Sequence, residues 1–293
     1  MAEKRSPGEH VFDFANVLFM LLIVVLTLYP FLYVAFSSLS NPARLTAHSG
    51  PMFWPLGLEF GSYAAVLKNP MIRIGYLNTL LYVFVGTSLN LLMTSLGAYV
   101  LSRKRYFMKR IFMFTIVFTM FFNGGLVPFY LNIRMLGILN TRWALLLPPA
   151  ISTYNLIVMR TSFAAIPDSM EESAKMDGAN DFIILFRIIL PLSLPVVAVM
   201  VLFYGVYHWS AWFNASILLQ TRTLYPLQLV LREILIQSST DSMSTGVSGM
   251  DKEMIGESIK YATIMVATLP ILFVYPFLQK YFVKGVMVGA IKE

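Results

Sequence analysis

The chain has 293 residues, of which 57% are hydrophobic and 13% charged, and its net charge is +7. Soluble domains usually contain about 25% charged residues, so this composition excludes an ordinary soluble protein and indicates one embedded in a membrane. Excess lysine and arginine is then typical of loops on the inner side of that membrane, and we expect no binding to nucleic acid.

Cofactor and metal sites have little sequence support. The chain has no cysteine, which excludes disulfides and thiolate metal ligands. His10, His48 and His208 lie far apart without metal-site spacing, so we expect no metal. No Gly-x-x-x-x-Gly-Lys-[Ser/Thr] motif is present to cradle nucleotide phosphates, so we expect neither a bound cofactor nor ATP hydrolysis in this chain, and no catalytic residues.

Runs of about 20 mostly apolar residues are long enough to cross a bilayer as helices. Six such runs predict an all-α, multi-pass membrane protein, with a membrane domain over 14–283 between terminal segments 1–13 and 284–293. The expected spans are 14–37, 77–102, 111–131, 143–164, 190–214 and 261–283. Gly124-Gly125 interrupts the third span and Pro148-Pro149 the fourth, and such breaks require neighbours that satisfy the freed backbone groups.

The orientation follows from basic residues near the span ends, because these accumulate on the cytoplasmic side. The connection after the second span holds five of them: Arg103, Lys104, Arg105, Lys109 and Arg110. This connection and both termini are therefore expected in the cytoplasm, and the chain in the cytoplasmic (inner) membrane.

Three longer segments are then expected outside, at 38–76, 132–142 and 215–260. The first should contain a short helix near 60–68. The last includes the small, polar run 238–249, which predicts a mobile external loop.

A polar, acidic segment at 167–191 stands between the fourth and fifth apolar runs. Pro167 stops a helix from continuing out of the preceding residues. Asp168 and Glu171 have capping-box spacing, which predicts a helix that starts near Ser169.

Gly178 in this segment would cost about 1 kcal/mol inside a helix, so a turn is expected there. Asp177, Asn180 and Asp181 around it favour a turn or the N-cap of a second helix. The segment then becomes apolar up to Pro191. We expect a helix–turn–helix knob that is rigidly attached to the fifth span.

The residues of this knob resemble the coupling segment of ABC importer permeases, which carry Glu-Ala-Ala-x-x-Asp-Gly-Ala. The matching positions are Glu172, Ser173, Ala174, Asp177, Gly178, Ala179 and, further on, Pro191. Ser173 departs from the pattern but is also small. We call residues 167–191 the coupling segment.

Most of the chain is similar to permease subunits of binding-protein-dependent carbohydrate importers, in the family of the shorter maltose-importer permease. Within that family it resembles the branch for larger or acidic oligosaccharides. The resemblance implies a type I ABC importer permease that works by alternating access.

Several partners are implied by the same resemblance. These are a second permease in a heterodimer, two cytoplasmic ATPase subunits that bind ATP and magnesium, and an external solute-binding protein. The coupling segment would dock on an ATPase, with Glu172 facing a basic or polar group there.

Aromatic and polar residues concentrate near the end of the fifth span, and they are the candidate lining of a saccharide path: Tyr204, Tyr207, His208, Trp209, Trp212 and Asn214. Aromatic faces pack well against the C–H surfaces of sugars. The alternative is an interfacial aromatic belt in contact with membrane lipid.

A different class, the ion-coupled secondary transporter of a small solute, needs titratable residues within its spans and often has inverted repeats. His208 is the candidate proton relay here, and no internal repeat is evident. The coupling segment has no role in that class.

Overall fold

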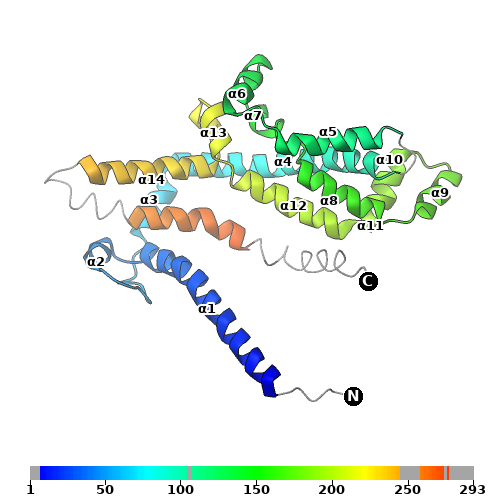
Figure 1. Ribbon diagram of the computed structural model, residues 1–293. Coiled ribbons are helices and arrows are strands. Elements are labelled where there is room, and N and C mark those ends of the chain that lie inside the picture. The colour runs from blue at the N-terminus through cyan, green and yellow to red at the C-terminus, as the bar shows by residue number, and fades with distance from the viewer. Residues whose placement is uncertain (1–6, 104–106, 245–257, 274–275, 277–293) are drawn as a thin grey trace. The chain divides into compact units, whose positions relative to one another are not determined.

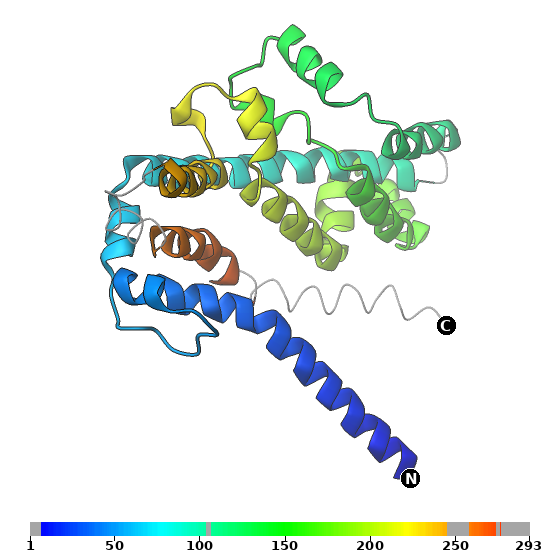
Figure 2. The ribbon, with the colours of Figure 1, turned by 60° about the vertical axis from the view of Figure 1, so that its left-hand side comes forward.

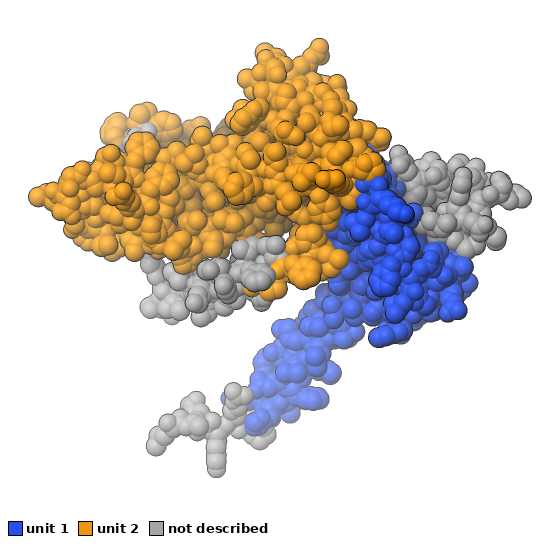
Figure 3. All heavy atoms as spheres, turned by 180° about the vertical axis from the view of Figure 1, so that it is seen from behind, with its two compact units in different colours: residues 1–69, 231–268 blue, residues 70–230, 269–293 orange. Residues whose placement is uncertain are grey.

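The structure is a computed structural model that describes residues 7–103, 107–244, 258–273 and 276 (Figure 1). It divides into two compact units, unit 1 with residues 1–69 and 231–268, and unit 2 with residues 70–230 and 269–293 (Figure 3). The described elements are helices, apart from an isolated bridge between Ser40 and Leu58, which confirms the all-α prediction for this part of the chain.

Unit 1 begins with the long helix α1 (Pro7–Ser38), which continues into α2 (Pro42–Ala47) and α3 (Gly61–Lys68). The α3 helix confirms the short helix predicted near 60–68. Asn41 starts α2 by accepting hydrogen bonds from the backbone N–H groups of Ala43 and Arg44.

Unit 2 is built on α4 (Pro70–Ser102), against which α8 (Thr153–Ala164) and α12 (Leu194–Trp209) pack (Figures 1 and 2). The buried face of α4 is mostly small or polar, whereas its exposed face carries large apolar residues such as Phe84 and Leu92. This inverted pattern is typical of a membrane helix that contacts protein on one side and lipid on the other.

Glycine lets α4 approach α12 closely at one position. A Cβ atom on Gly86 would lie only 2.4 Å from Nε2 of His208. His208 fills this space, is fully buried, and its Nε2 lies 2.7 Å from Oδ1 of Asn90 on the same face of α4.

Two described helices are long and apolar enough to cross a membrane alone, α1 from Gly8 and α4. Two bent pairs qualify together: α5 (Lys109–Phe121) with α6 (Leu126–Met135), bent by 118°, and residues Asp181–Leu192 with α12, bent by 88°. The count of six spans and the side on which the termini lie stay predictions.

Two expected spans are not continuous helices. Residues 143–164 form α7 (Trp143–Leu146) and α8, because the prolines at 148 and 149 lack the N–H groups that a helix needs. Residues 190–214 are broken at Ser193, between Pro191 and Pro195, for the same reason, and again after α12 ends at Trp209.

The expected external loop 215–260 is largely helical where it is described. It contains the end of α13 (Phe213–Leu218), the 3₁₀ turn η2 (Arg222–Leu224) and α14 (Leu227–Ser244). Of the loop predicted at 238–249, the residues up to Ser244 are helical instead, because the buried run at 227–231 starts a helix that continues into the polar residues.

Some predicted features lie outside the described residues. These are residues 1–6 of the N-terminal segment, Lys104 and Arg105, residues 245–257 of the external loop, residues 274–275 and 277–283 of the sixth span, and the segment 284–293.

The Gly86 contact predicts a clear stability difference between two glycine-to-alanine variants. Gly86→Ala must displace the His208 ring, and such overpacking typically costs about 1–3 kcal/mol. Gly205→Ala, on α12, adds a Cβ whose nearest neighbour beyond the backbone of its own helix is Oγ1 of Thr87 at 4.0 Å. Thermal unfolding in detergent should show a lower Tm for Gly86→Ala only, and equal Tm values would contradict this packing.

Candidate functional site

The coupling segment folds as the predicted helix–turn–helix. Helix α9 (Asp168–Met176) ends in a turn and α10 (Asp181–Ile184) follows. Gly178 has φ of +82°, its N–H bonds to Lys175 O, and the Ala179 N–H bonds to Ala174 O, which is a Schellman ending. Oδ1 of Asn180 accepts the N–H of Ile183 at 2.9 Å and caps α10. The turn at Gly178 and the cap at Asn180 are thus confirmed.

The predicted capping box at the start of α9 is wrong. The helix begins at Asp168, and Pro167 occupies the N-cap position without a side-chain hydrogen bond. With Pro167 at the N-cap, the third helical residue is Met170, so Glu171 does not stand at the position from which a capping box closes. Glu171 is used differently.

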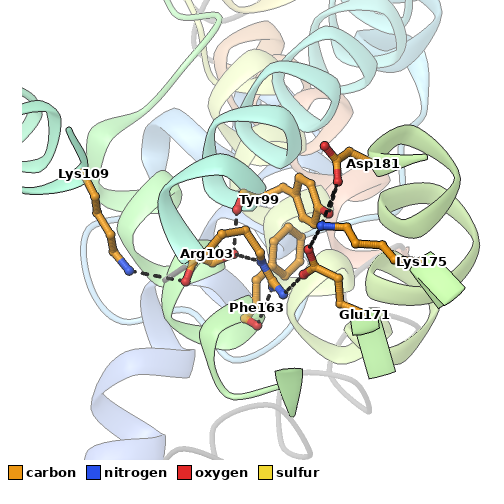
Figure 4. Close-up of polar contacts among 8 residues, drawn as sticks. Tyr99, Arg103, Lys109, Phe163, Glu171, Lys175 and Asp181 are labelled. Carbon is orange, nitrogen blue, oxygen red and sulfur yellow. Dashed lines mark hydrogen bonds and ion pairs between the residues drawn. The ribbon is translucent and has the colours of Figure 1, made fainter. Parts of the chain in front are cut away.

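Glu171 is the centre of a charged cluster that joins α9 to the end of α4 (Figure 4). One carboxylate oxygen lies 2.5 Å from Nη1 of Arg103, and the other lies 2.7 Å from Nζ of Lys175. The second guanidinium nitrogen of Arg103 donates to Phe163 O at 3.1 Å, and the Tyr99 hydroxyl donates to Asp181 at 3.3 Å. Helices α4, α8, α9 and α10 therefore meet at these side chains.

The charges of this cluster support one another. Burial alone would raise the pKa of Glu171, but hydrogen bonds from Lys175 and Arg103 outweigh it and hold that pKa below its usual value. The hydrogen bond to Glu171 is the main reason that the pKa of Lys175 is raised. Both groups are consequently ionised at neutral pH.

The residues predicted for ATPase coupling occupy two kinds of position. Glu172, Ser173, Asp177, Gly178 and Pro191 are exposed. Ala174 is only 8% exposed, and with Ala179 it packs on the apolar core that contains Phe163 and Ile184. These two alanines hold the knob together from inside, while the turn presents an open surface.

The segment passes into α12 through an irregular route. The π-helix η1 (Leu185–Ile189) and the short α11 (Leu190–Leu192) precede the 88° bend at Ser193. The segment is thus joined to α12 through a bend, and the rigidity of this attachment stays a prediction.

The second candidate site lies where α12 crosses α4 and α8. The hydroxyl of Tyr204 lies 2.7 Å from Oγ1 of Thr94 and accepts the N–H of Ser152 at 3.2 Å. Tyr204, His208 and Trp209 are all buried. A lipid-facing aromatic belt therefore does not describe these three residues.

A hollow of about 240 Å³ opens beside Tyr204. Its lining residues come from the break before α8, from α8 and from α12: Pro149, Ile151, Ser152, Asn155, Phe203, Tyr204 and Tyr207. The structure thus brings together Tyr204 and Tyr207 among the predicted path residues, whereas His208, Trp209, Trp212 and Asn214 are not part of this lining.

Two lining residues, Ser152 and Phe203, were not predicted from the sequence, whereas Asn155 stood out there as a polar residue within a predicted span. The Pro148-Pro149 pair carried a signal for this region, because an interrupted membrane helix requires polar neighbours for its freed backbone groups. Asn90 provides one by donating from Nδ2 to Pro149 O.

Comparison with known proteins gives a consistent picture. Residues 57–288 match the family described as binding-protein-dependent transport system inner membrane component. The chain is 37% identical to the polygalacturonan/rhamnogalacturonan transport system permease protein YtcP of Bacillus subtilis (strain 168), over 97% of this chain and 99% of that one. It is 38% identical to protein LplC of the same organism, over 98% and 97% of the two chains.

A solved structure is also similar. A chain from the crystal structure of a bacterial ABC transporter involved in the import of the acidic polysaccharide alginate superposes with a TM-score of 0.87 at 32% identity, covering 96% of this chain and 100% of that chain. The protein belongs to the family of inner membrane components of binding-protein-dependent transport systems, the permeases of ABC importers.

Proposed function

We propose that this chain is the membrane-spanning permease subunit of an ATP-driven importer of oligosaccharides, with acidic oligosaccharides as the preferred class. The observation that carries the proposal is the knob at one end of unit 2, with its exposed turn at Gly178, in a chain of this family. The relatives named for polygalacturonan/rhamnogalacturonan transport and alginate import support the substrate class.

In this proposal the exposed part of the coupling segment docks in a cleft of a cytoplasmic ATPase. Nothing lies within 4 Å of the position that a Cβ on Gly178 would occupy, so a partner surface can approach the backbone there. Glu172 supplies a negative charge at the same surface. ATP and magnesium bind to the ATPase pair, and its closure moves the segment.

The remaining partners and the topology follow from the same proposal. A second permease forms a heterodimer with this chain in the cytoplasmic membrane, and a loaded external binding protein delivers the sugar. The proposed topology is six spans with both termini and the Arg103 end of α4 in the cytoplasm.

The hollow beside Tyr204 is the proposed part of the sugar path. Phe203, Tyr204 and Tyr207 supply aromatic surface, and Asn155 and Ser152 supply polar groups that can bind hydroxyls. This mixture of apolar walls and few polar groups is typical of small-molecule sites. Buried His208 packs against Gly86 and Asn90 instead, which gives no support to an ion-coupled transporter.

If the segment docks through Glu172, the variant Glu172→Ala should fold normally but bind the ATPase more weakly. Truncating one member of a buried charge pair at an interface costs about 2 kcal/mol or more, which corresponds to about 30-fold weaker association. Affinity purification in mild detergent should recover a second permease and an ATPase with the wild type and much less ATPase with the variant.

Glu9→Ala, on α1, is the matched control and should recover the complex like the wild type. Both variants should melt at the wild-type Tm. Recovery of the wild-type chain without any ATPase would contradict the proposed function.

The sugar path predicts a binding defect when the Tyr207 ring is removed. Loss of an aromatic contact costs about 1.5–3 kcal/mol, so the KM for oligogalacturonate uptake by the reconstituted complex should rise about 10- to 140-fold in Tyr207→Ala. Phe213→Ala removes a half-exposed aromatic residue outside the hollow and should leave KM unchanged. Equal KM values in the wild type, Tyr207→Ala and Phe213→Ala would show that the sugar does not pass through the hollow.

A further inference from the structure

We propose that Arg103 is a positioning residue that latches the coupling segment to the end of α4, so that movement of the segment is passed to α4 and α8 directly. This inference deepens the proposed function and rests on it for its role in transport. It concerns a route of force transmission, which runs through side chains at one corner of unit 2.

The covalent route from the knob to α12 is a poor mechanical connection. It passes through the π-helix at 185–189 and then turns by 88° at Ser193. Pro191 and Pro195 on either side of the bend lack N–H groups, so backbone hydrogen bonds that would stiffen a helix are missing there. A push on α9 is therefore not carried along the axis of α12.

The route through Arg103 is short and has many bonds. Its guanidinium contacts Glu171 of α9 through Nη1, Phe163 O of α8 through Nη2, and Ser102 Oγ through Nε at 2.9 Å. The same group lies 5.0 Å from the ring centroid of Tyr99. One side chain at the end of α4 thus joins three helices.

The ion pair in this latch is sheltered. The side chains of Arg103 and Glu171 are 14% and 12% exposed. Charge-assisted hydrogen bonds are about twice as strong as neutral ones, and solvent screens this pair less than an exposed one. Lys175, which is more exposed, lies one turn further along α9 and binds the other carboxylate oxygen of Glu171.

Further contacts hold the end of α4 and the neighbouring helices together. Nε of Arg160 on α8 donates to Leu101 O at 3.1 Å, and Nζ of Lys109 donates to Ser102 O at 3.3 Å, so the last carbonyl groups of α4 are held by neighbouring helices. Beneath them Phe163, Ala174 and Ile184 pack in one buried core. A displacement of α9 must therefore move α4 and α8 or break the latch.

The planar fork of arginine matters in this arrangement. A lysine at 103 has one nitrogen and no fixed fork, so it cannot hold Glu171 and Phe163 O in the same geometry. We therefore expect Arg103→Lys to keep only part of the function of the latch.

The first test measures how rigidly α9 is held against α4 in the purified full chain, and it does not depend on any partner subunit. The protein has no cysteine, so Met176→Cys on α9 and Leu92→Cys on α4 give two defined positions for spin labels. Both side chains are exposed, at 88% and 42%. The distance distribution should be narrow in the otherwise unchanged chain and clearly broader with Arg103→Ala.

Charge reversal makes this test independent of misfolding. Glu171→Arg alone should broaden the distribution. The double variant Arg103→Glu with Glu171→Arg should narrow it only in part, because a glutamate at 103 restores the ion pair but cannot donate to Phe163 O, and an arginine at 171 faces Lys175. Arg110→Ala, which removes an exposed charge from the same connection, should leave it unchanged. A distribution for Arg103→Ala as narrow as that of the parent would overturn the latch.

The second test measures transport per ATP in the reconstituted complex with oligogalacturonate as the probe. Arg103→Ala should keep ATP hydrolysis and lower sugar uptake per ATP about tenfold, the factor for 1.4 kcal/mol. The charge-reversed pair should recover part of this loss, because it restores the ion pair but not the bond to Phe163 O. Wild-type uptake per ATP in Arg103→Ala would overturn the role in transmission, whereas absence of an ATPase from the wild-type complex would overturn the proposed function and leave the distance result standing.

Discussion

The need to satisfy backbone groups freed by helix breaks in an apolar environment shapes unit 2. Around α4 the chain is broken near Pro149 and at 222–227, and polar side chains of α4 bind the exposed groups. Asn90 donates to Pro149 O and Tyr82 to Leu224 O, while Thr79 accepts the N–H of Leu227. Unsatisfied groups would each cost several kcal/mol in lipid, so these bonds fix where the irregular segments lie.

One helix face consequently organises both candidate sites. Asn78, Tyr82, Gly86, Asn90 and Thr94 recur every four residues and form one buried ridge. Thr94 reaches the hollow through Tyr204, and Arg103, nine positions further on, holds the coupling segment. Nine residues of helix span about 14 Å. A rigid body that contains α4 thus connects the proposed ATPase contact to the proposed sugar path.

Local signals predicted part of this architecture. The composition indicated membrane helices, and Gly178 with Asn180 predicted the turn and cap, because both depend on residues within a few positions. The Arg103–Glu171 contact joins residues 68 positions apart, so no local pattern reports it. The capping-box pattern failed because Pro167 took the N-cap position, and the loop at 238 failed because helix α14 started upstream in buried apolar residues.

The adjacent acids Glu171 and Glu172 show how the knob can transmit force. Successive residues of a helix point about 100° apart, so Glu171 faces Arg103 while Glu172 faces outward. A contact on the outer acid moves the membrane helices only if the inner side of the same helix is fixed to them. The exposed turn therefore needs the buried latch, and the pair Glu171–Glu172 divides these two tasks between neighbouring residues of α9.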